Sequence, residues 1–226
     1  MRMLAVFEKS ERIRHIGHLD IQRSVQRGLR RSNLPVAYSN GYNPHILITF
    51  ASALSTGACG LREIMDVTMA EEVSEIEFLE RMNKAMPPEL HLIEAHAVDD
   101  RHPSLMGSLR AASYDLLIRD ENQAGIIIGA IPSMMDRERI PAMRKTKTAI
   151  KETDIKPLIY QLAGKENHLF ATLALTEKEA CKPGMLIDAL KKEAGIPEEA
   201  EVRTLITRTG LLGEDASGTL IPLEQL

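Results

Sequence analysis

The segment spanning residues 12–63 constrains the fold of this chain more than any other. Within residues 18–32 the apolar side chains recur every four residues: Ile21, Val25 and Leu29. This spacing predicts an amphipathic helix. Pro35 ends it, because the residue before a proline is displaced from the helical region. Residues 38–45 follow and are rich in Asn, Gly and Pro, which favour turns. The sequence therefore predicts a helix followed by a turn-rich loop.

Strand-like segments and helices alternate in the first half of the chain. Strands are predicted over residues 2–9, 46–50, 61–69 and 90–98, and helices over residues 18–32 and 73–86. Ser74 and Glu77 form a capping box at the start of the second helix. The resulting order, β-α-β-β-α-β, is the ferredoxin-like pattern.

The second half has a similar order of elements. Strands are predicted over residues 114–118, 158–162, 168–175 and 202–207, helices over 124–135 and 184–194, and an extended segment over 145–155. We therefore expect an α+β protein made of two tandem ferredoxin-like (βαββαβ) units. The expected units span residues 1–98 and 109–210, and residues 211–226 form a C-terminal tail.

Charge is distributed unevenly along the sequence. Residues 1–50 contain eight basic and three acidic side chains, a net charge of +5, although the whole chain has a net charge of −4. A local positive region on an acidic protein predicts contact with a particular anionic partner.

Several classes of protein are disfavoured by the sequence. No apolar run reaches 18 residues, so no membrane span is expected. The first residues meet a charge too early for a signal-peptide core, and a cytoplasmic location is expected. Cys59 and Cys181 form no Cys-x-x-Cys pair, so neither a disulfide framework nor a thiolate metal site is expected.

Arginines occupy the side of the predicted helix opposite to its apolar stripe. They are Arg23, Arg27, Arg30 and Arg31. Guanidinium groups match phosphate oxygens and contact a nucleic-acid backbone without reading its sequence. In the alternative, Arg23 and Arg27 pair with Asp20 and Glu63, and the other arginines are solvated. The residues predicted to bind phosphate or RNA are Arg14, Arg23, Arg27, Arg30, Arg31, Tyr38, Asn43 and His45.

Three histidines lie in or beside the same segment: His15, His18 and His45. If they converge at one end of the sheet, they suit a metal ion or supply a general base. No carboxylate or cysteine completes a recognised ligand spacing, so no metal is expected. His18 and His45 remain candidate catalytic residues. In the alternative, His18 begins the helix and packs against the loop.

An ordered set of residues resembles a known family, the radical SAM-linked proteins of unknown function. The matching positions are Lys9, Arg14, His18, Leu19, Asp20, Arg23, Arg27, Arg30, Arg31, Leu34, Pro35, Tyr38, Ser39, Gly41, Asn43, Pro44, His45, Ala53, Leu54, Gly57 and Glu63. The match is dense over residues 3–67 and scattered to about residue 190. Gly17 stands where the family has Ser, which removes a hydroxyl that would cap the helix.

The resemblance implies a partner rather than an activity. In that family the domain stands alone or is joined to the C-terminus of a radical SAM protein, and no activity is established. The companion would hold the iron–sulfur cluster, because this chain lacks the Cys-x-x-x-Cys-x-x-Cys motif; no cofactor is expected here. The genes of that family tend to lie near ribonuclease and ribosomal-protein genes, so the resemblance also points to RNA.

The leading hypothesis is a bacterial accessory domain without activity of its own. It binds RNA, or another phosphate-bearing substrate, for a radical SAM partner. One alternative is an RNA-processing or RNA-modifying enzyme that uses His18 or His45. A second alternative is a protein-interaction module whose arginines meet acidic patches on the partner.

Overall fold

A computed structural model describes residues 1–145 and 150–226 of this α+β protein. The chain forms two compact units. Unit 1 consists of Met1–Leu109 together with Arg208–Leu226, and unit 2 consists of Arg110–Thr207. Unit 1 therefore includes the C-terminal segment. Residues 146–149, which belong to the extended segment predicted over 145–155, lie outside the described residues.

The sheet of unit 1 is built on antiparallel pairs around β1. Its first four strands are β1 (Arg2–Lys9), β2 (Ile48–Phe50), β3 (Ala58–Thr68) and β4 (Leu92–Val98). They have the order β4-β1-β3, and β2 also pairs with β3. The later part of β10 (Thr204–Glu214) lies beside β3, and β11 (Leu220–Pro222) pairs with β10. The strand predicted over 202–207 is thus longer than expected.

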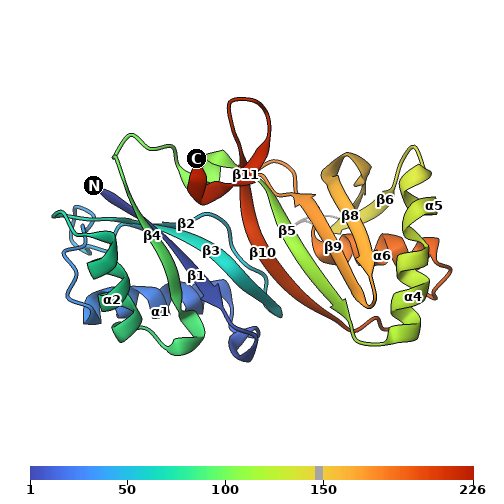
Figure 1. The fold of residues 1–226 in the computed structure, drawn as a ribbon, viewed down its shortest axis with the longest axis horizontal. Helices are drawn as coiled ribbons and strands as arrows, with labels where there is room; N and C mark the ends of the chain where they lie inside the picture. The colour runs from blue at the N-terminus through green and yellow to red at the C-terminus, as the bar shows by residue number, and fades with distance from the viewer. Residues whose placement is uncertain (146–149) are drawn as a thin grey trace. The chain divides into compact units, whose positions relative to one another are not determined.

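Two helices cover one face of this sheet (Figure 1). They are α1 (His18–Arg31) and α2 (Glu75–Ala85). Alternate residues of β1, namely Met3, Ala5 and Phe7, are buried in the same core as the apolar stripe of α1. Removing each large apolar side chain from water contributes about 1.5–3 kcal/mol. The four-residue spacing seen in the sequence therefore marks the face of α1 that meets the sheet.

The two helices also hold each other at their C-terminal ends. Arg31 of α1 donates to the carbonyl oxygen of Ala85, through Nε at 3.2 Å and Nη2 at 2.6 Å. In return, Arg81 of α2 donates from Nε to the carbonyl oxygen of Ser32 at 2.9 Å. The last carbonyls of a helix carry partial negative charge and lack helical partners, so an arginine stabilises them.

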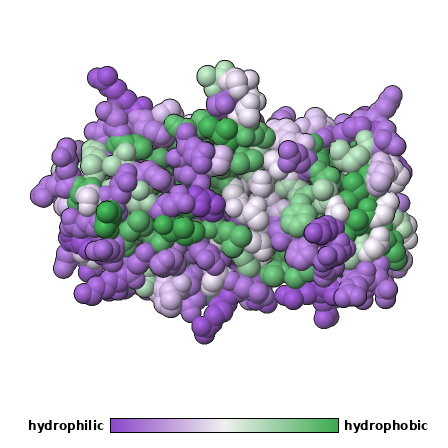
Figure 2. Space-filling model, in the orientation of Figure 1, coloured by the Kyte–Doolittle hydropathy of each residue, from purple (hydrophilic) through white to green (hydrophobic). Residues whose placement is uncertain are grey.

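Short elements complete unit 1. They are the 3-10 helices η1 (Glu11–Ile13), η2 (Pro88–Leu90) and η4 (Leu223–Gln225), and the single turn α3 (Leu105–Ser108). Leu223 is fully buried, so the C-terminal segment packs onto the body of unit 1. Within the described residues, no helix is long and apolar enough to cross a membrane. The face drawn in Figure 2 is largely hydrophilic, with hydrophobic residues in smaller groups.

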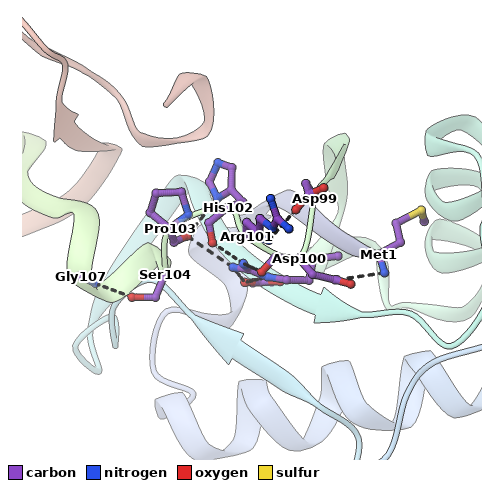
Figure 3. Close-up of polar contacts among 10 residues, drawn as sticks. Met1, Asp99, Asp100, Arg101, His102, Pro103, Ser104 and Gly107 are labelled. Carbon is purple, nitrogen blue, oxygen red and sulfur yellow. Dashed lines mark hydrogen bonds and ion pairs between the residues drawn. The ribbon is translucent and has the colours of Figure 1, made fainter.

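The connection after β4 is fixed at the start of β1 (Figure 3). Arg2 pairs with the buried carboxylate of Asp66, and it also donates to the carbonyl oxygens of His102 and Pro103. The amino group of Met1 lies 3.0 Å from Oδ1 of Asp100. The hydrogen bond to Asp66 raises the pKa of Arg2 above its ordinary value. The segment that follows β4 is therefore attached to the sheet of unit 1 by a charged residue of the first strand.

Unit 2 contains β5 (Leu109–Ile118), β8 (Ile159–Lys165) and β9 (His168–Ala174). With the first part of β10 they have the order β10-β5-β9-β8. A separate two-stranded sheet pairs β6 (Pro141–Lys145) with β7 (Ile150–Asp154), and η3 (Lys156–Leu158) follows. The sequence did not predict β6.

Three helices belong to unit 2: α4 (Glu121–Gly129), α5 (Ile131–Asp136) and α6 (Pro183–Glu193). The helix predicted over 124–135 is divided into α4 and α5. Pro132 lies in the first turn of α5, where its missing N–H costs nothing. The break near Ala130 therefore has a local cause.

Two helical glycines should respond in opposite ways to substitution by alanine, because one is closely packed and the other faces open space. A Cβ on Gly28 would lie 2.3 Å from Sδ of Met86, whereas a Cβ on Gly125 in α4 meets open space. We expect Gly28→Ala to destabilise unit 1 by about 1–3 kcal/mol through overpacking. Gly125→Ala should stabilise unit 2 by roughly 0.5–1 kcal/mol through helix propensity. Urea unfolding of both variants tests this, and a stabilising Gly28→Ala would contradict the packing described.

Candidate functional site

A buried ion pair lies between β3 and β10 in unit 1. Arg208 and Glu63 are 2% and 4% exposed. Nε of Arg208 donates to Oε1 of Glu63 at 2.8 Å, and a second guanidinium nitrogen pairs with Oε2. Arg208 also donates to the hydroxyl of Ser52 at 3.3 Å. A Cβ on Gly60 would lie 2.6 Å from the Glu63 side chain, so this carboxylate fits because residue 60 is glycine.

Lys9 forms the third charged member of this cluster and is 2% exposed. Its Nζ donates to the carbonyl oxygens of Arg14 and Ile16, each at 3.0 Å. The amide of Gly57 donates to the same Arg14 carbonyl at 2.8 Å. Burial lowers the pKa of Lys9, against the opposing effects of Cys59 and of the Glu63 carboxylate. Lys9 thereby holds the loop that leads directly into α1.

A small pocket opens beside this cluster at the N-terminal end of α1. Its lining residues are Phe7, Lys9, His18, Ile21, Phe50, Ser52, Leu54 and Glu63. The volume of this cavity is about 10 Å³. That is close to the minimum needed for one water molecule. The pocket therefore admits one oxygen-sized group without movement of its walls.

His18 contributes a half-buried polar group to the pocket. Its ring meets Phe50 edge-on, with centroids 5.2 Å apart at 84°. Burial lowers the pKa of His18, so the imidazole is neutral at pH 7. Its ring nitrogens have no hydrogen-bond partner in the described part of the chain. A neutral imidazole of this kind is able to accept or donate one hydrogen bond to a ligand.

The arginines of α1 point away from the core and are exposed. Nη1 of Arg23 lies 3.0 Å from Oδ1 of Asp20, and both side chains are more than 60% exposed. Among the described residues, Arg27 and Arg30 have neither an ion pair nor a hydrogen-bond acceptor. Arg31 is held by Ala85. The outer face of α1 therefore carries positive charge that the described chain only partly neutralises.

In the alternative considered from the sequence, Arg23 and Arg27 pair with Asp20 and Glu63, but neither arginine contacts Glu63. Glu63 points from β3 into the core and binds Arg208, whereas Arg27 lies on the solvent side of α1. The Asp20 carboxylate pairs with Arg23. Arg14 donates to the carbonyl oxygen of Glu11 at 3.2 Å, near the carboxylate of the same residue.

The turn-rich loop is folded by a local hydrogen-bond network. The hydroxyl of Ser39 lies 2.8 Å from Nδ1 of His45 and accepts from the His45 amide at 3.1 Å. Tyr38 is 46% exposed, and both Tyr42 and Asn43 are exposed. The loop presents aromatic and amide groups to solvent without burying them.

The three histidines are not gathered into one site. His45 precedes β2, whereas His18 touches Phe50 at the end of that strand. His15 is exposed in the turn before α1. Across the ranges that the structure describes, no group of three His, Cys, Asp or Glu side chains is arranged to hold a metal ion.

Sequence reasoning did not single out Arg208 or Ser52. Arg208 is 145 residues from its partner Glu63, and no periodicity connects two positions so far apart. The only local signal is one arginine inside the apolar segment Leu205–Leu212. A buried charge requires a partner, so that arginine could have been taken as the mark of a buried ion pair.

Removing one partner of the buried ion pair should be far more costly than removing one partner of an exposed pair. Glu63→Gln leaves the buried guanidinium of Arg208 without its countercharge, and we expect a loss of about 3–5 kcal/mol in the free energy of unfolding. The matched control is Glu94→Gln, whose carboxylate pairs with Arg62 at 2.7 Å and is 35% exposed. Glu94→Gln should lower the free energy of unfolding by no more than about 1 kcal/mol. Equal losses in urea unfolding would contradict the role given to Glu63.

The environment of His18 predicts a specific pH dependence of stability. The pKa of His18 is lower in the folded protein than its ordinary value of 6.5. The unfolded chain therefore binds this proton first, and stability present above about pH 6.5 is lost as pH falls through the folded pKa. His18→Phe keeps the ring contact with Phe50 and removes the titration. Between pH 7 and 5 the variant should lose less stability than the parent; identical slopes would disprove the assignment.

The sequence matches a family described as "Uncharacterized protein conserved in bacteria (DUF2344)" over residues 2–183. This match includes the buried cluster except Arg208, the whole of α1 and most of unit 2. A comparison with curated proteins found no match. The chain therefore belongs to the DUF2344 family of uncharacterised bacterial proteins.

Proposed function

We propose that this protein binds RNA, or another phosphate-bearing substrate, through the outer face of α1. The observation that carries the proposal is the exposure of Arg23, Arg27 and Arg30 on one side of a helix whose other side is fixed to the sheet. At about 100° per residue these three positions fall within roughly 60° of one another. A rigid row of guanidinium groups suits successive phosphates.

The charge that this face offers is available to a ligand. Arg27 and Arg30 have no acceptor within the described chain, and the Arg23–Asp20 pair is solvent-exposed. An exposed pair of this kind contributes roughly 0–1 kcal/mol, so a phosphate can displace it. Tyr38, Asn43 and His45, in the loop after α1, would add stacking and hydrogen bonding to bases.

The partner proposed for this function is a radical SAM protein. The support is the family resemblance carried by the ordered residues of the first 67 positions. In this proposal the chain has no activity of its own and brings the substrate to the partner. The proposed architecture is a tandem of ferredoxin-like units. The strand orders β4-β1-β3 and β10-β5-β9-β8, each with helices between the strands, support it.

The experiment is RNA binding by the full chain across a salt series, comparing two double variants of equal charge. Arg27→Ala/Arg30→Ala removes the two unpartnered side chains of α1 and leaves Arg31 on Ala85. Arg101→Ala/Arg203→Ala removes two exposed arginines elsewhere. We expect the α1 variant to weaken binding at least about tenfold and to reduce the salt slope by roughly 1.4, because each single-strand phosphate contact contributes about 0.7.

The outcome separates the proposal from its rivals. Equal effects of the two double variants, or binding independent of salt, would contradict a phosphate-binding face on α1. Cleavage or modification of the RNA that is lost in His18→Phe would favour the enzymatic alternative. Capture of a radical SAM protein that resists nuclease treatment but requires Arg27 and Arg30 would favour the protein-interaction alternative.

A further inference from the structure

The buried cluster beside α1 contains more positive than negative charge. Glu63 is neutralised by Arg208, with which it shares two hydrogen bonds. Lys9 is then left as a buried ammonium whose only described acceptors are two backbone carbonyls. An ammonium has three N–H donors, so one donor of Lys9 has no acceptor in the described chain. Lys9 lines the small pocket, where a bound anion would add to the charges of Cys59 and Glu63 that already favour its protonated form.

The start of α1 offers further donors at the same place. The N-cap is Gly17, which has no side chain to cap the helix. The amides of His18 and Leu19 donate no hydrogen bond within the described residues, as expected for the first turn of an uncapped helix. His18 itself lines the pocket, and its neutral ring has an unused nitrogen. Lys9 and His18 therefore line a space the size of one oxygen atom, and the free amides lie at the first turn of the helix that carries His18.

We propose that this pocket binds a terminal phosphate, with one phosphate oxygen inside the pocket and the others at the first turn of α1. The inserted oxygen accepts from the third N–H of Lys9 and from the His18 ring. The outer oxygens accept from the amides of His18 and Leu19, where the helix dipole favours an anion. The apolar walls formed by Phe7, Phe50 and Leu54 lower the local dielectric constant and so strengthen these contacts.

This inference rests on the proposed function, because the same helix carries the arginine face. Leu19 is four residues before Arg23, so the two lie on the same side of α1. A strand whose end is fixed at the first turn of α1 can therefore pass directly onto the arginines. The substrate class is then single-stranded RNA with a terminal phosphomonoester, as opposed to RNA with hydroxyl ends.

The test uses one single-stranded RNA sequence in three forms: hydroxyl at both ends, 5′-phosphate and 3′-phosphate. We expect one phosphorylated form to bind the full chain at least about tenfold more tightly, as charge-assisted hydrogen bonds allow. Equal affinities for the three forms would overturn the inference.

The decisive variant is Gly17→Asp, because it should fold. The backbone of Gly17 has φ −72°, and a Cβ there would lie 3.7 Å from the Thr56 hydroxyl, an ordinary contact. Asp is a favoured N-cap residue, and its carboxylate would occupy the free amides. We expect it to abolish the preference for the phosphorylated end. Asn122→Asp, which adds the same charge to unit 2, should preserve the preference. Lys9→Met should also abolish it, provided the variant remains folded.

Failure of the inference and failure of the proposed function give different results. If all three RNAs bind with equal affinity and Arg27→Ala/Arg30→Ala lowers each affinity by the same factor, the pocket assignment is wrong. The assignment of RNA binding to the arginines of α1 is then retained. If no RNA binds, the pocket is tested with small anions. The unfolding temperature is measured with inorganic phosphate, acetate or chloride at equal ionic strength. Stabilisation by phosphate alone, lost in Gly17→Asp, would support the pocket without RNA. No stabilisation, or equal stabilisation by acetate, would overturn the phosphate assignment.

Discussion

The buried pair of Arg208 and Glu63 is the interaction on which unit 1 most depends. It joins β10, near the end of the chain, to β3, near its beginning. Taking both charges out of water costs several kcal/mol per ion, and only good geometry offsets that cost. The two hydrogen bonds between the side chains, the Ser52 hydroxyl and the absence of a side chain at Gly60 supply this geometry. The C-terminal segment is therefore an integral part of the first unit.

The same cluster determines where α1 begins. Lys9 of β1 pairs with Gly60 of β3 and holds the carbonyls of Arg14 and Ile16, which fixes the turn into the helix. Once its start and its apolar stripe are fixed, α1 has little freedom to rotate. Its arginines are then held on the solvent side as a defined row. A charge network that is buried for structural reasons thus positions the surface that we assign to binding.

Local features of this chain could be predicted from its sequence, and long-range features could not. The four-residue spacing of Ile21, Val25 and Leu29 identified both faces of α1, because helix periodicity is a property of neighbouring residues. The Ser74 cap of α2 was likewise visible, and its hydroxyl accepts from the Glu77 amide at 3.2 Å. Glu63 was named as an ion-pairing residue, but its partner Arg208 was not found, because nothing near Glu63 in the sequence points to Arg208.

The end of β10 and the pocket are also long-range features that could not be predicted from the sequence. The sequence predicted a strand ending near residue 207, but β10 continues to Glu214 because it pairs with β11 and lies beside β3. The pocket joins residues of β1, α1, β2 and β3 that only tertiary structure brings together. His18 was a candidate from its position, whereas its lowered pKa and contact with Phe50 depend on burial by a distant strand.

The most direct test of this account is to map the amide chemical-shift changes of the isotopically labelled full chain during titration with single-stranded RNA. If α1 is the binding element, the largest changes should lie in residues 18–31 and in the loop at residues 38–45. The buried strands should change little, because the helix is already fixed in its binding position. Changes confined to unit 2, with α1 unaffected at saturating RNA, would contradict the assignment of function to this helix.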